Sequence, residues 1–472
     1  MSDLVCPIAS SQKKHPQATA LRDEHSSTSY SELDSQVIQY CSVLAAAGVK
    51  RGDRAAIAET NRIELPAVLF AFFRMGVTAC LLNTRQPEAI LAQQVAFTRC
   101  KWLVNFDSHS KLPSTGTAAP LVLSPPGDPG PSGSRESQAM TIDQPATILF
   151  TSGSTGTPKA VLHTFGNHYY NALGSNETIV VEPGDRWLLS LPVYHVGGLA
   201  VLFRCFLAGA TVVMADPGDD LAGLIDQHGI THVSLVATQL RRLLEQTADT
   251  LEQLRTLKAM LLGGGPIPEP LITRAGERDL PVYRSYGLTE MASQVSTSSR
   301  PDGTARVILP YREARIGKHN EVFVRGATRF AGYVQGDKLV QPFDDQGWFA
   351  TGDTGYIEND GLFVTGRRDC MFVSGGENIH PEQIERVLDG IDGVSQSVVV
   401  GLADEEYGCR PVAFVRSVRS LSSNELTAAL REQLPGYMIP AAYFPWPEHV
   451  PVSLKPDRSR FLRLAEDLSQ KQ

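Results

Sequence analysis

Apolar and polar positions follow two different periods along the first hundred residues. From Tyr30 to Gly48 apolar residues recur every three or four positions, which predicts an amphipathic helix. A second helix is predicted from Leu65 to Gly76, because the run ends at a glycine, the residue that commonly closes a helix. Residues 54–59 predict a short buried strand between them. Alternation of helices and strands is typical of an α/β fold.

Short apolar runs closed by glycine or proline continue through the middle of the chain. They are ATILF (146–150), RWLLSL (186–191), ATVVMA (210–215) and AMLL (259–262). Such runs are typical of buried parallel strands, whose carboxyl ends open on one edge of the sheet. We expect each to be followed by a glycine loop and a helix, with one helix over 221–228. The glycine loops should therefore cluster in space.

The segment 113–137 departs from this pattern, because it is rich in Pro, Gly and Ser. Its many turn formers and few apolar groups predict a surface loop. A linker between two domains is the alternative, since linkers share this composition.

The pattern changes again near Gly366. The sequence GRRDCMFVSGGENIHPEQIERVL leads into a helix, and SVVVGLA then predicts a strand, with another helix over 424–434. We therefore predict an α/β protein with a large N-terminal domain of layered sheets and helices, residues 1–366. Residues 367–472 are predicted to form a small α+β domain.

Length and composition agree with two domains. The chain has 472 residues, 42% of them hydrophobic and 20% charged, as in an ordinary soluble globular protein. Single hydrophobic cores stop growing at roughly 250–300 residues, so more than one packed unit is expected.

Charge and cysteine content exclude several classes of protein. The formal net charge of -8 argues against a nucleic-acid binder, which usually presents a basic face. Seven scattered cysteines without a CxxC pair indicate neither a disulfide framework nor a zinc site. The first residues lack the pattern of a signal peptide, which favours a cytoplasmic location. The longest apolar stretch, 65–82, contains Pro66 and Arg74, so no membrane span is predicted.

The segment TSGSTGTPK, Thr151 to Lys159, follows the predicted strand ATILF directly. Its hydroxyl groups, its backbone N–H groups at the glycines and its lysine together suit a polyphosphate. It is not a Walker A loop, because GxxxxGK followed by Ser or Thr is absent. The alternative is a flexible surface turn.

Two shorter motifs carry further polar groups. In SYGLTEM (285–291), Gly287 allows close backbone approach, Thr289 can donate to a phosphate oxygen, and Glu290 can supply an oxygen ligand to Mg²⁺. A capping interaction at the start of a helix would explain the Thr and the Glu equally well. In TGD (351–353), Asp353 could accept both hydroxyls of a ribose, and an Asp in a turn is the alternative.

Taken in this order, TSGSTGTPK, YGLTE, TGD, GRRD and a late lysine resemble the superfamily of adenylate-forming enzymes. That superfamily includes acyl-CoA synthetases, luciferases and peptide-synthetase adenylation domains. The resemblance spans nearly the whole chain. It implies a large N-terminal domain that binds ATP and a carboxylic acid, and a small C-terminal domain that rotates between two half-reactions.

The resemblance also implies roles for individual residues. Thr289 would contact the α-phosphate, Glu290 would bind Mg²⁺, and Asp369 matches the hinge position. Lys455 resembles the lysine that bridges carboxylate and phosphate oxygens, although Ser453 and Leu454 replace the usual TG before it; a solvated lysine is the alternative. Gly375 and Gly376 would face the CoA tunnel. The ATP-binding residues would be Thr151, Ser152, Gly153, Ser154, Thr155, Gly156, Lys159, Gly263, Gly264, Gly265, Tyr286, Gly287, Asp353 and Arg367.

The acid pocket is expected around LPVYHVGGLAVLFRCFLAGATVV. His195 would border the acyl site and the thiol path, and a core histidine is the alternative. Arg204 interrupts an apolar run from Leu199 to Leu207. Because a buried guanidinium without a partner is costly, it should either reach water or meet an anion such as a second carboxylate of the substrate.

The segments around these residues narrow the resemblance. SLPVYHVGGLAVLFRCFLAGA, SLVATQLRRLL, YGLTEMAS and FVSGGENIHPEQIERV look like the 2-succinylbenzoate:CoA ligases of menaquinone biosynthesis. Arg204 falls on the arginine that in those enzymes helps to recognise the carboxylate that is not activated. Gly197 stands where that family often has a serine, which puts help from that side chain in doubt.

The implied function is ATP-dependent formation of 2-succinylbenzoyl-CoA with release of AMP and pyrophosphate. The alternatives are another aryl or fatty acid CoA ligase, a stand-alone adenylation enzyme that loads a carrier protein, and a nucleotide-binding protein without catalysis. ATP, Mg²⁺, CoA and a small carboxylic acid are the implied ligands, with no nucleic acid and no membrane span. A homo-oligomer remains open.

Overall fold

The structure is a computed structural model. It describes residues 3–106, 118–123, 140–151, 159–215, 220–265, 267, 269–300, 306–374, 377–448, 450 and 457–469.

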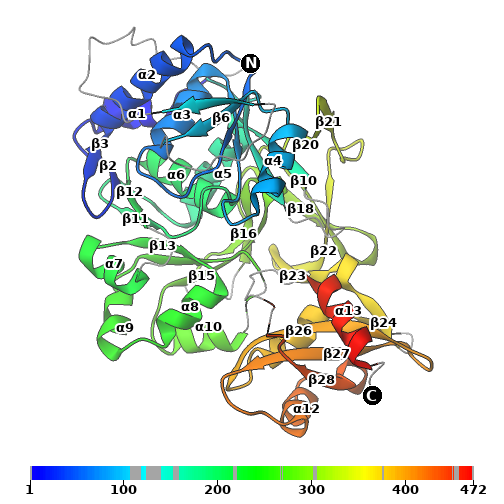
Figure 1. The fold of residues 1–472 in the computed structure, drawn as a ribbon. Helices are drawn as coiled ribbons and strands as arrows, with labels where there is room; N and C mark the ends of the chain where they lie inside the picture. Colours follow the sequence, from blue (N-terminus) through cyan, green and yellow to red (C-terminus); the bar gives the residue numbers. More distant parts are fainter. Residues whose placement is uncertain are drawn as a thin grey trace.

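Two large sheets dominate the described part of the chain (Figure 1). The eight-stranded sheet runs, in spatial order, β21 (Lys338–Val340), β20 (Gly332–Gln335), β10 (Lys159–Thr164), β9 (Pro145–Thr151), β5 (Thr78–Leu81), β4 (Arg54–Ile57), β6 (Trp102–Asn105) and β7 (Ala119–Val122). The nine-stranded sheet runs β17 (Arg306–Ile308), β16 (Ser293–Ser298), β15 (Val282–Leu288), β14 (Ala259–Leu262), β13 (His232–Leu235), β11 (Arg186–Leu189), β12 (Thr211–Met214), β2 (Thr19–Arg22) and β3 (Ser27–Ser29).

Smaller sheets and the helices complete the fold. The other strands are β1 (Asp3–Leu4), β8 (Met140–Thr141), β18 (Arg312–Ile316), β19 (Glu321–Gly326), β22 (Phe349–Glu358), β23 (Gly361–Arg367), β24 (Phe372–Ser374), β25 (Glu377–Ile379), β26 (Val394–Asp404), β27 (Gly408–Ser417) and β28 (Ala442–Pro445). The helices are α1 (Pro7–Lys14), α2 (Tyr30–Ala46), α3 (Leu65–Met75), α4 (Glu88–Phe97), α5 (Phe165–Thr178), α6 (Val196–Ala208), α7 (Leu221–His228), α8 (Ala237–Leu244), α9 (Ala248–Leu254), α10 (Glu269–Gly276), α11 (Pro381–Leu388), α12 (Ser423–Arg431) and α13 (Arg458–Ser469). Single 3₁₀ turns are η1 (Thr289–Met291), η2 (Lys318–Asn320), η3 (Arg368–Cys370) and η4 (Gly436–Met438).

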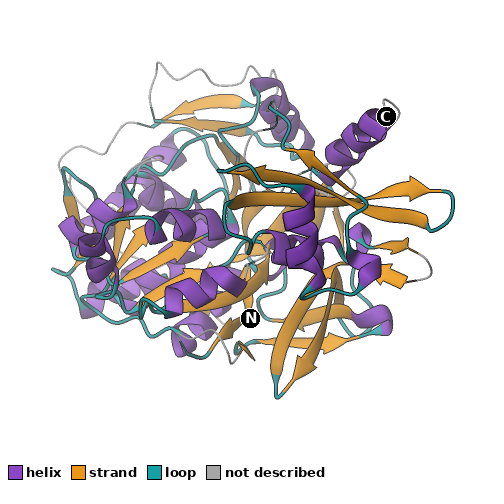
Figure 2. Ribbon diagram, turned by 90° about the horizontal axis from the view of Figure 1, so that it is seen from below, coloured by secondary structure: helices purple, strands orange, loops and turns teal. Residues whose placement is uncertain are grey.

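The main core lies between the two large sheets. Helices α3, α5 and α6 meet there through a cluster of aromatic rings, including Phe70, Phe73, Phe165 and Phe203. Because both sides of α3 face apolar neighbours, every residue from Leu65 to Arg74 is buried. Figure 2 shows helices on both sides of the strands of the two large sheets. Layering of this kind confirms the predicted α/β class.

Local features of the sequence explain where the first helices begin and end. α2 starts at Ser29 with a capping box, in which the Ser29 hydroxyl and the Glu32 carboxylate each bind the other residue's backbone N–H. α3 stops at Gly76, whose φ of 72° is left-handed. Both helices and the strand β4 agree with the sequence prediction.

Strands β12, β11, β13, β14 and β15 are parallel, and the predicted runs RWLLSL, ATVVMA and AMLL account for β11, β12 and β14. Two expectations were wrong. The run ATILF is β9 of the other sheet, and the chain after it returns as the antiparallel strand β10 rather than as a helix. Within the predicted loop 113–137, Ala119–Val122 form β7, because this segment pairs with β6 at the sheet edge.

The C-terminal part has cores of its own. Strands β26, β27 and β28 form a sheet that is covered by α11 and α12 on one face and by α13 on the other. The run SVVVGLA is continuously apolar because Val398 and Val400 face one side while Val399 faces the other. In Figure 1 this sheet lies below β22 and β23, apart from the large sheets. None of the helices in the described part of the chain has the length and apolar content needed to cross a membrane.

Candidate functional site

The predicted phosphate loop begins at the end of β9. Thr151 and Lys159 are opposite each other in the β9–β10 ladder, so the chain between them closes on itself at the carboxyl end of β9. The predicted residues Ser152 to Gly156 lie outside the described residues. The Lys159 ammonium sits 5.1 Å from the centre of the Tyr333 ring. The Lys159 ammonium of β10 therefore lies over Tyr333 of β20, near the carboxyl end of β9.

Glu290 lies beside the same tyrosine. The Tyr333 hydroxyl donates to Glu290 Oε1 at 2.8 Å, and the Phe330 backbone N–H donates to the Glu290 carbonyl at 2.8 Å. The 3₁₀ turn that holds Thr289 and Glu290 has no side-chain cap at its start, so the capping explanation of this motif is wrong. The structure thus brings Lys159 and Glu290 to two sides of one phenol.

The backbone of the YGLTE motif is tightly constrained. A Cβ on Gly287 would lie 2.1 Å from the Ser293 carbonyl oxygen, so only glycine fits at this register shift between β15 and β16. Ala292 and Ser293 have φ values of 54° and 121°. Strained backbone of this kind is typical of functional sites.

A buried polar chain supports the same turn, and the sequence analysis missed it. His163 Nε2 lies 2.6 Å from the Thr289 carbonyl oxygen. The Thr147 hydroxyl lies 3.4 Å from His163 Nδ1 and 2.8 Å from His168 Nε2. Burial lowers the pKa of His163 to about 4, so the neutral ring donates from Nε2 to the carbonyl. Burial, reinforced by His163, also lowers the pKa of His168.

Asp353 connects the YGLTE motif with the GRRD motif. Its Oδ2 accepts from the Tyr286 hydroxyl at 2.5 Å, and its Oδ1 accepts from Arg367 Nη1 at 3.1 Å. TGD lies inside β22, opposite Arg367 of β23, so the explanation as an Asp in a turn is wrong. Burial and the Asp353 charge raise the pKa of Tyr286 well above its ordinary value.

The triple glycine follows β14 at the carboxyl edge of the nine-stranded sheet. A Cβ on Gly263 would meet the Ser285 carbonyl oxygen at 3.5 Å, so this loop lies against β15 next to Tyr286. Gly264 has a φ of 90°. The triple glycine and Tyr286 therefore lie next to each other at the carboxyl edge of this sheet.

His195 precedes α6, and its ring lies edge-on to Tyr194, with 4.8 Å between ring centres. The residue is exposed, so the explanation as a core histidine is wrong. A Cβ on Gly197 would contact only Leu191 Cδ1, at 3.4 Å. His195 at the amino end of α6 is therefore accessible from solvent.

Arg204 lies two turns further along α6 and is 1% exposed. Nη2 donates to Gln294 Oε1 at 2.5 Å, and the guanidinium lies 5.2 Å from the Trp187 ring centre. Nε and Nη1 have no hydrogen-bond partner among the described residues. Burial lowers the pKa of Arg204 to about 10. Of the two alternatives left by the sequence, a side chain that reaches water is wrong.

A second buried arginine shares this region. Arg312 donates to the carbonyls of Pro310, Asn171 and Gln294, so it adds positive charge next to Arg204. Burial and the Arg204 charge lower its pKa to about 9. Neither arginine forms an ion pair within the described part of the chain. Arg312 was not predicted, because the sequence LPYREARI around it contains no pattern that is typical of a binding site.

Several predicted residues remain untested. Gly375, Gly376 and Lys455 lie outside the described residues, as does the side chain of Asp369. The backbone of Asp369 belongs to the turn η3, directly after β23.

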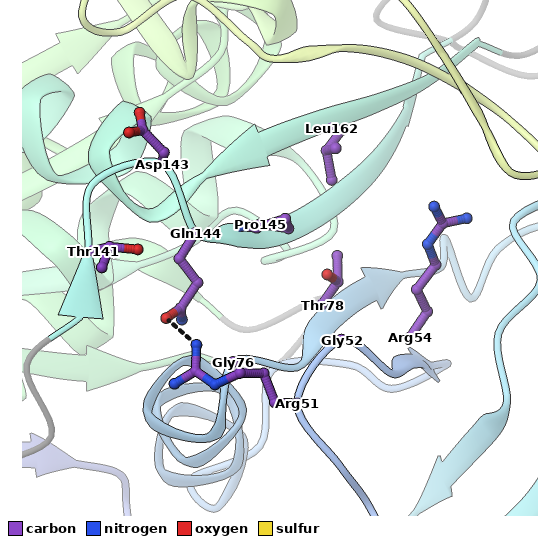
Figure 3. Close-up of a pocket in the computed structure, with 10 residues that line it drawn as sticks. All are labelled: Arg51, Gly52, Arg54, Gly76, Thr78, Thr141, Asp143, Gln144, Pro145 and Leu162. Atoms are coloured by element: carbon purple, nitrogen blue, oxygen red, sulfur yellow. Dashed lines mark hydrogen bonds between the residues drawn. The ribbon is translucent and has the colours of Figure 1, made fainter. Parts of the chain in front are cut away.

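A pocket of about 400 Å³ lies elsewhere (Figure 3). Its lining includes Arg54, Thr78 and Pro145, which are the first residues of β4, β5 and β9. Thr151 is at the opposite end of β9, roughly 20 Å away at the rise of a strand. Arg51 donates to Gln144 across this pocket at 3.5 Å. The pocket is thus separate from the residues that surround Glu290 and Asp353.

Comparisons with known proteins agree with this geometry. The model of the AMP-binding enzyme family matches residues 8–334, and that of the AMP-binding enzyme C-terminal domain matches residues 383–451. A 2-succinylbenzoate–CoA ligase of Bacillus velezensis is 37% identical over 436 residues, which cover 88% of this chain and 86% of that protein.

Solved structures lead to the same group. The o-succinylbenzoate CoA synthetase of Bacillus subtilis in complex with its acyl-adenylate intermediate has a TM-score of 0.87 at 32% identity, covering 98% of both chains. The same synthetase in complex with ATP and magnesium ion also has a TM-score of 0.87, at 31% identity, covering 98% of this chain and 100% of that one. The chain therefore belongs to the AMP-binding enzyme family and, within it, to the group of 2-succinylbenzoate–CoA ligases.

Proposed function

We propose that this protein is an ATP-dependent acid–thiol ligase that activates 2-succinylbenzoate as an acyl adenylate and transfers it to CoA. The products are 2-succinylbenzoyl-CoA, AMP and pyrophosphate. The observation that supports the choice of acid is Arg204. Two donor atoms of its buried guanidinium have no partner within the ranges that the structure describes, and a second carboxylate on the substrate would supply them with acceptors.

The ATP site is proposed from the residues around Tyr286 and Tyr333. Thr151, Lys159 and the intervening loop would bind the phosphates, and Thr289 would bind the α-phosphate. Asp353 and Arg367 would hold the ribose, with the adenine against Gly263, Gly264, Gly265 and Tyr286, and Gly287 would allow close backbone approach to ATP. The paired contacts of Asp353 with Tyr286 and Arg367 support this arrangement, because they fix the carboxylate before a nucleotide arrives.

Glu290 fits the metal expected with ATP. It offers a carboxylate next to the phosphate loop, and Mg²⁺ usually takes one or two protein carboxylates together with phosphate oxygens. The described residues contain no cluster of three or more metal-binding side chains, so the phosphates would have to contribute ligands. When bound, Mg²⁺ would supply positive charge to the phosphate oxygens.

In the first step a substrate carboxylate oxygen attacks the α-phosphorus of ATP. A carbon–oxygen–phosphorus linkage forms, the bond to the β-phosphate breaks, and pyrophosphate leaves. Negative charge grows on the α-phosphate, where the Thr289 hydroxyl and Lys455 would stabilise it more than they stabilise the ground state. His163 holds the carbonyl of Thr289, so this donor is positioned in advance.

In the second step the CoA sulfur, after loss of the thiol proton, attacks the acyl carbon. A carbon–sulfur bond forms and the bond to AMP breaks. His195 would border the thiol path at the amino end of α6. We propose that residues 367–472 rotate about Asp369 between the two steps, withdrawing Lys455 and bringing Gly375 and Gly376 to the tunnel.

A cytoplasmic location is proposed as well, because all seven cysteines are free thiols.

Pyrophosphate release with ATP and Mg²⁺ tests the function. The panel of acids contains 2-succinylbenzoate, benzoate, coumarate and medium-chain acids, with and without CoA. A selective response to succinylbenzoate and a CoA thioester product would support the proposal. Release with another acid would keep the adenylation chemistry and overturn the choice of substrate. Adenylate formation without a thioester would favour transfer to a carrier protein instead.

A further inference from the structure

Tyr333 is placed by strand pairing on the face of the sheet that carries Lys159. In the β10–β20 ladder Tyr333 is opposite Val161, two residues from Lys159, and side chains two apart on a strand share a face. The ammonium therefore lies over the phenol ring, at 5.1 Å from its centre. This distance is within the range of a cation–π contact.

The other end of the same side chain reaches Glu290. The Tyr333 hydroxyl donates to Glu290 Oε1 at 2.8 Å. Burial and the Glu290 charge raise the pKa of Tyr333, so the hydroxyl keeps its proton and remains a donor. Phe330 packs edge-on against the tyrosine, with 4.9 Å between ring centres, and its backbone N–H binds the Glu290 carbonyl. One short segment thus fixes both the side chain and the backbone of Glu290.

Lys159 and Glu290 are opposite charges that could otherwise neutralise each other. Within the described part of the chain they form no ion pair at 4.0 Å or less, and the phenol contacts both. We propose that Tyr333 is a positioning residue for the metal-binding half of the ATP site. It aims the Glu290 carboxylate at the position of Mg²⁺ and keeps Lys159 available to the phosphates. This inference rests on the proposed function, because it presupposes that Mg²⁺ and ATP bind here.

Calorimetric titration of ATP, with no acid present, tests the inference. The affinity is measured in excess Mg²⁺ and in EDTA, and the ratio reports how much the metal strengthens binding. Tyr333→Phe keeps the ring and removes the hydroxyl. We expect it to reduce the ratio about fivefold or more, while the affinity in EDTA changes less than about twofold. Tyr333→Leu should also weaken binding in EDTA, by about threefold, because Lys159 loses the ring.

Two controls separate positioning from a general structural effect. Tyr407→Phe removes the hydroxyl of an exposed tyrosine in the β26–β27 hairpin, next to Glu406, and should leave both affinities unchanged. In a Glu290→Gln background, Tyr333→Phe should change the ratio no further, because the hydroxyl acts through Glu290.

An unchanged ratio in Tyr333→Phe would overturn the inference, as would an equal effect with and without Glu290. Failure of the unmodified protein to bind ATP with Mg²⁺ would overturn the proposed function itself, and the inference with it. The two failures are therefore distinguishable.

Discussion

Arg204 donates one hydrogen bond, from Nη2 to Gln294, and two further donor atoms in the interior have no partner in the described part of the chain. Leaving buried donors unsatisfied costs roughly 1–3 kcal/mol, and more for charged groups. Gln294 cannot remove this cost, because its Oε1 also accepts from Ser175 and its Nε2 donates to Thr297. An anionic ligand group would supply the guanidinium with acceptors.

Substitution of Arg204 should therefore affect the acid more than ATP. We expect Arg204→Met to raise the KM for 2-succinylbenzoate on the order of a hundredfold, through loss of a charged hydrogen bond, and to change the KM for ATP less than about threefold. The acid KM of Arg204→Lys should lie between those of the unmodified protein and Arg204→Met, because lysine keeps the charge but not the planar fork. Steady-state pyrophosphate release measures both constants. An unchanged acid KM in Arg204→Met would exclude contact with the second carboxylate.

At the scale of elements, the ATP site depends on contacts between β9, β10, α5 and the turn after β15. Thr147 of β9, His163 of β10 and His168 of α5 form one buried polar chain that ends on the Thr289 carbonyl. The ring of His168 stacks on Phe203 of α6. The position of Thr289, the proposed contact of the α-phosphate, is thus coupled to the main core.

The burial of His163 in this group of polar side chains predicts a loss of stability in mild acid. Because the pKa of His163 falls from 6.5 to about 4 on folding, the unfolded chain binds a proton between these values and the folded chain does not. The contribution of His163 is fully present above pH 6.5 and decreases as the pH falls toward 4. Between pH 7 and pH 5 the free energy of unfolding should drop by about 2 kcal/mol from this group.

Urea unfolding at pH 7 and pH 5 measures this drop. His163→Gln keeps a donor for the Thr289 carbonyl and cannot titrate. Its free energy of unfolding should therefore fall between the two pH values by about 2 kcal/mol less than that of the unmodified protein. Equal losses in the two proteins would show that His163 is not the group that titrates. His319→Gln, in an exposed turn, serves as the control and should behave like the unmodified protein.

At the scale of the whole molecule, helix α8 of the large part contacts the C-terminal sheet. Arg241 Nη1 donates to the carbonyls of Val394 and Ser395 at 2.8 and 2.9 Å. The described chain superposes over 98% of its length on the adenylate-bound and ATP-bound relatives. The contact of Arg241 therefore belongs to a domain arrangement close to that of these two complexes.

Removal of this contact should affect the two half-reactions unequally. We expect Arg241→Ala to slow adenylation about three- to tenfold, because hydrogen bonds from a charged donor that hold this arrangement are lost. Thioester formation from supplied acyl adenylate should change less than about twofold. Arg242→Ala, an exposed neighbour on the same helix, is the matched control. Rapid-quench measurements of each half-reaction give the rates, and equal slowing of both would contradict the prediction.

Lys455 provides a second test of domain rotation. Lys455→Ala should depress adenylation far more than thioester formation from supplied acyl adenylate, because the lysine would act only before the rotation. The same rapid-quench assay applies. An equal loss in both half-reactions would remove Lys455 from its proposed role. Arg458, three residues later, donates to Glu382 and Glu385, so the start of α13 is anchored to α11.

Much of the fold could be predicted from local pattern. Helices α2, α3 and α7 and strands β11, β12 and β14 agree with the predicted segments, because continuous apolar runs and helix-ending glycines act locally. Strands β7 and β10 were missed. β7 is a short edge strand within a Pro- and Gly-rich segment, and β10 follows the phosphate loop, where a helix was expected. Pairing decided both: β7 pairs with β6, and β10 lies between β9 and the strand β20, which is distant in sequence.

The sequence by itself determined the α/β class, the order of the motifs and the residue types available for phosphate, metal and carboxylate. Those properties depend on short segments, in which spacing and chemistry are visible directly. Only the tertiary structure decided that Arg204 is buried without an ion pair within the described chain, that Arg312 lies near it, and that Tyr333 contacts both Lys159 and Glu290. Burial and contact depend on which distant strands and helices pack together, and no local pattern encodes that packing.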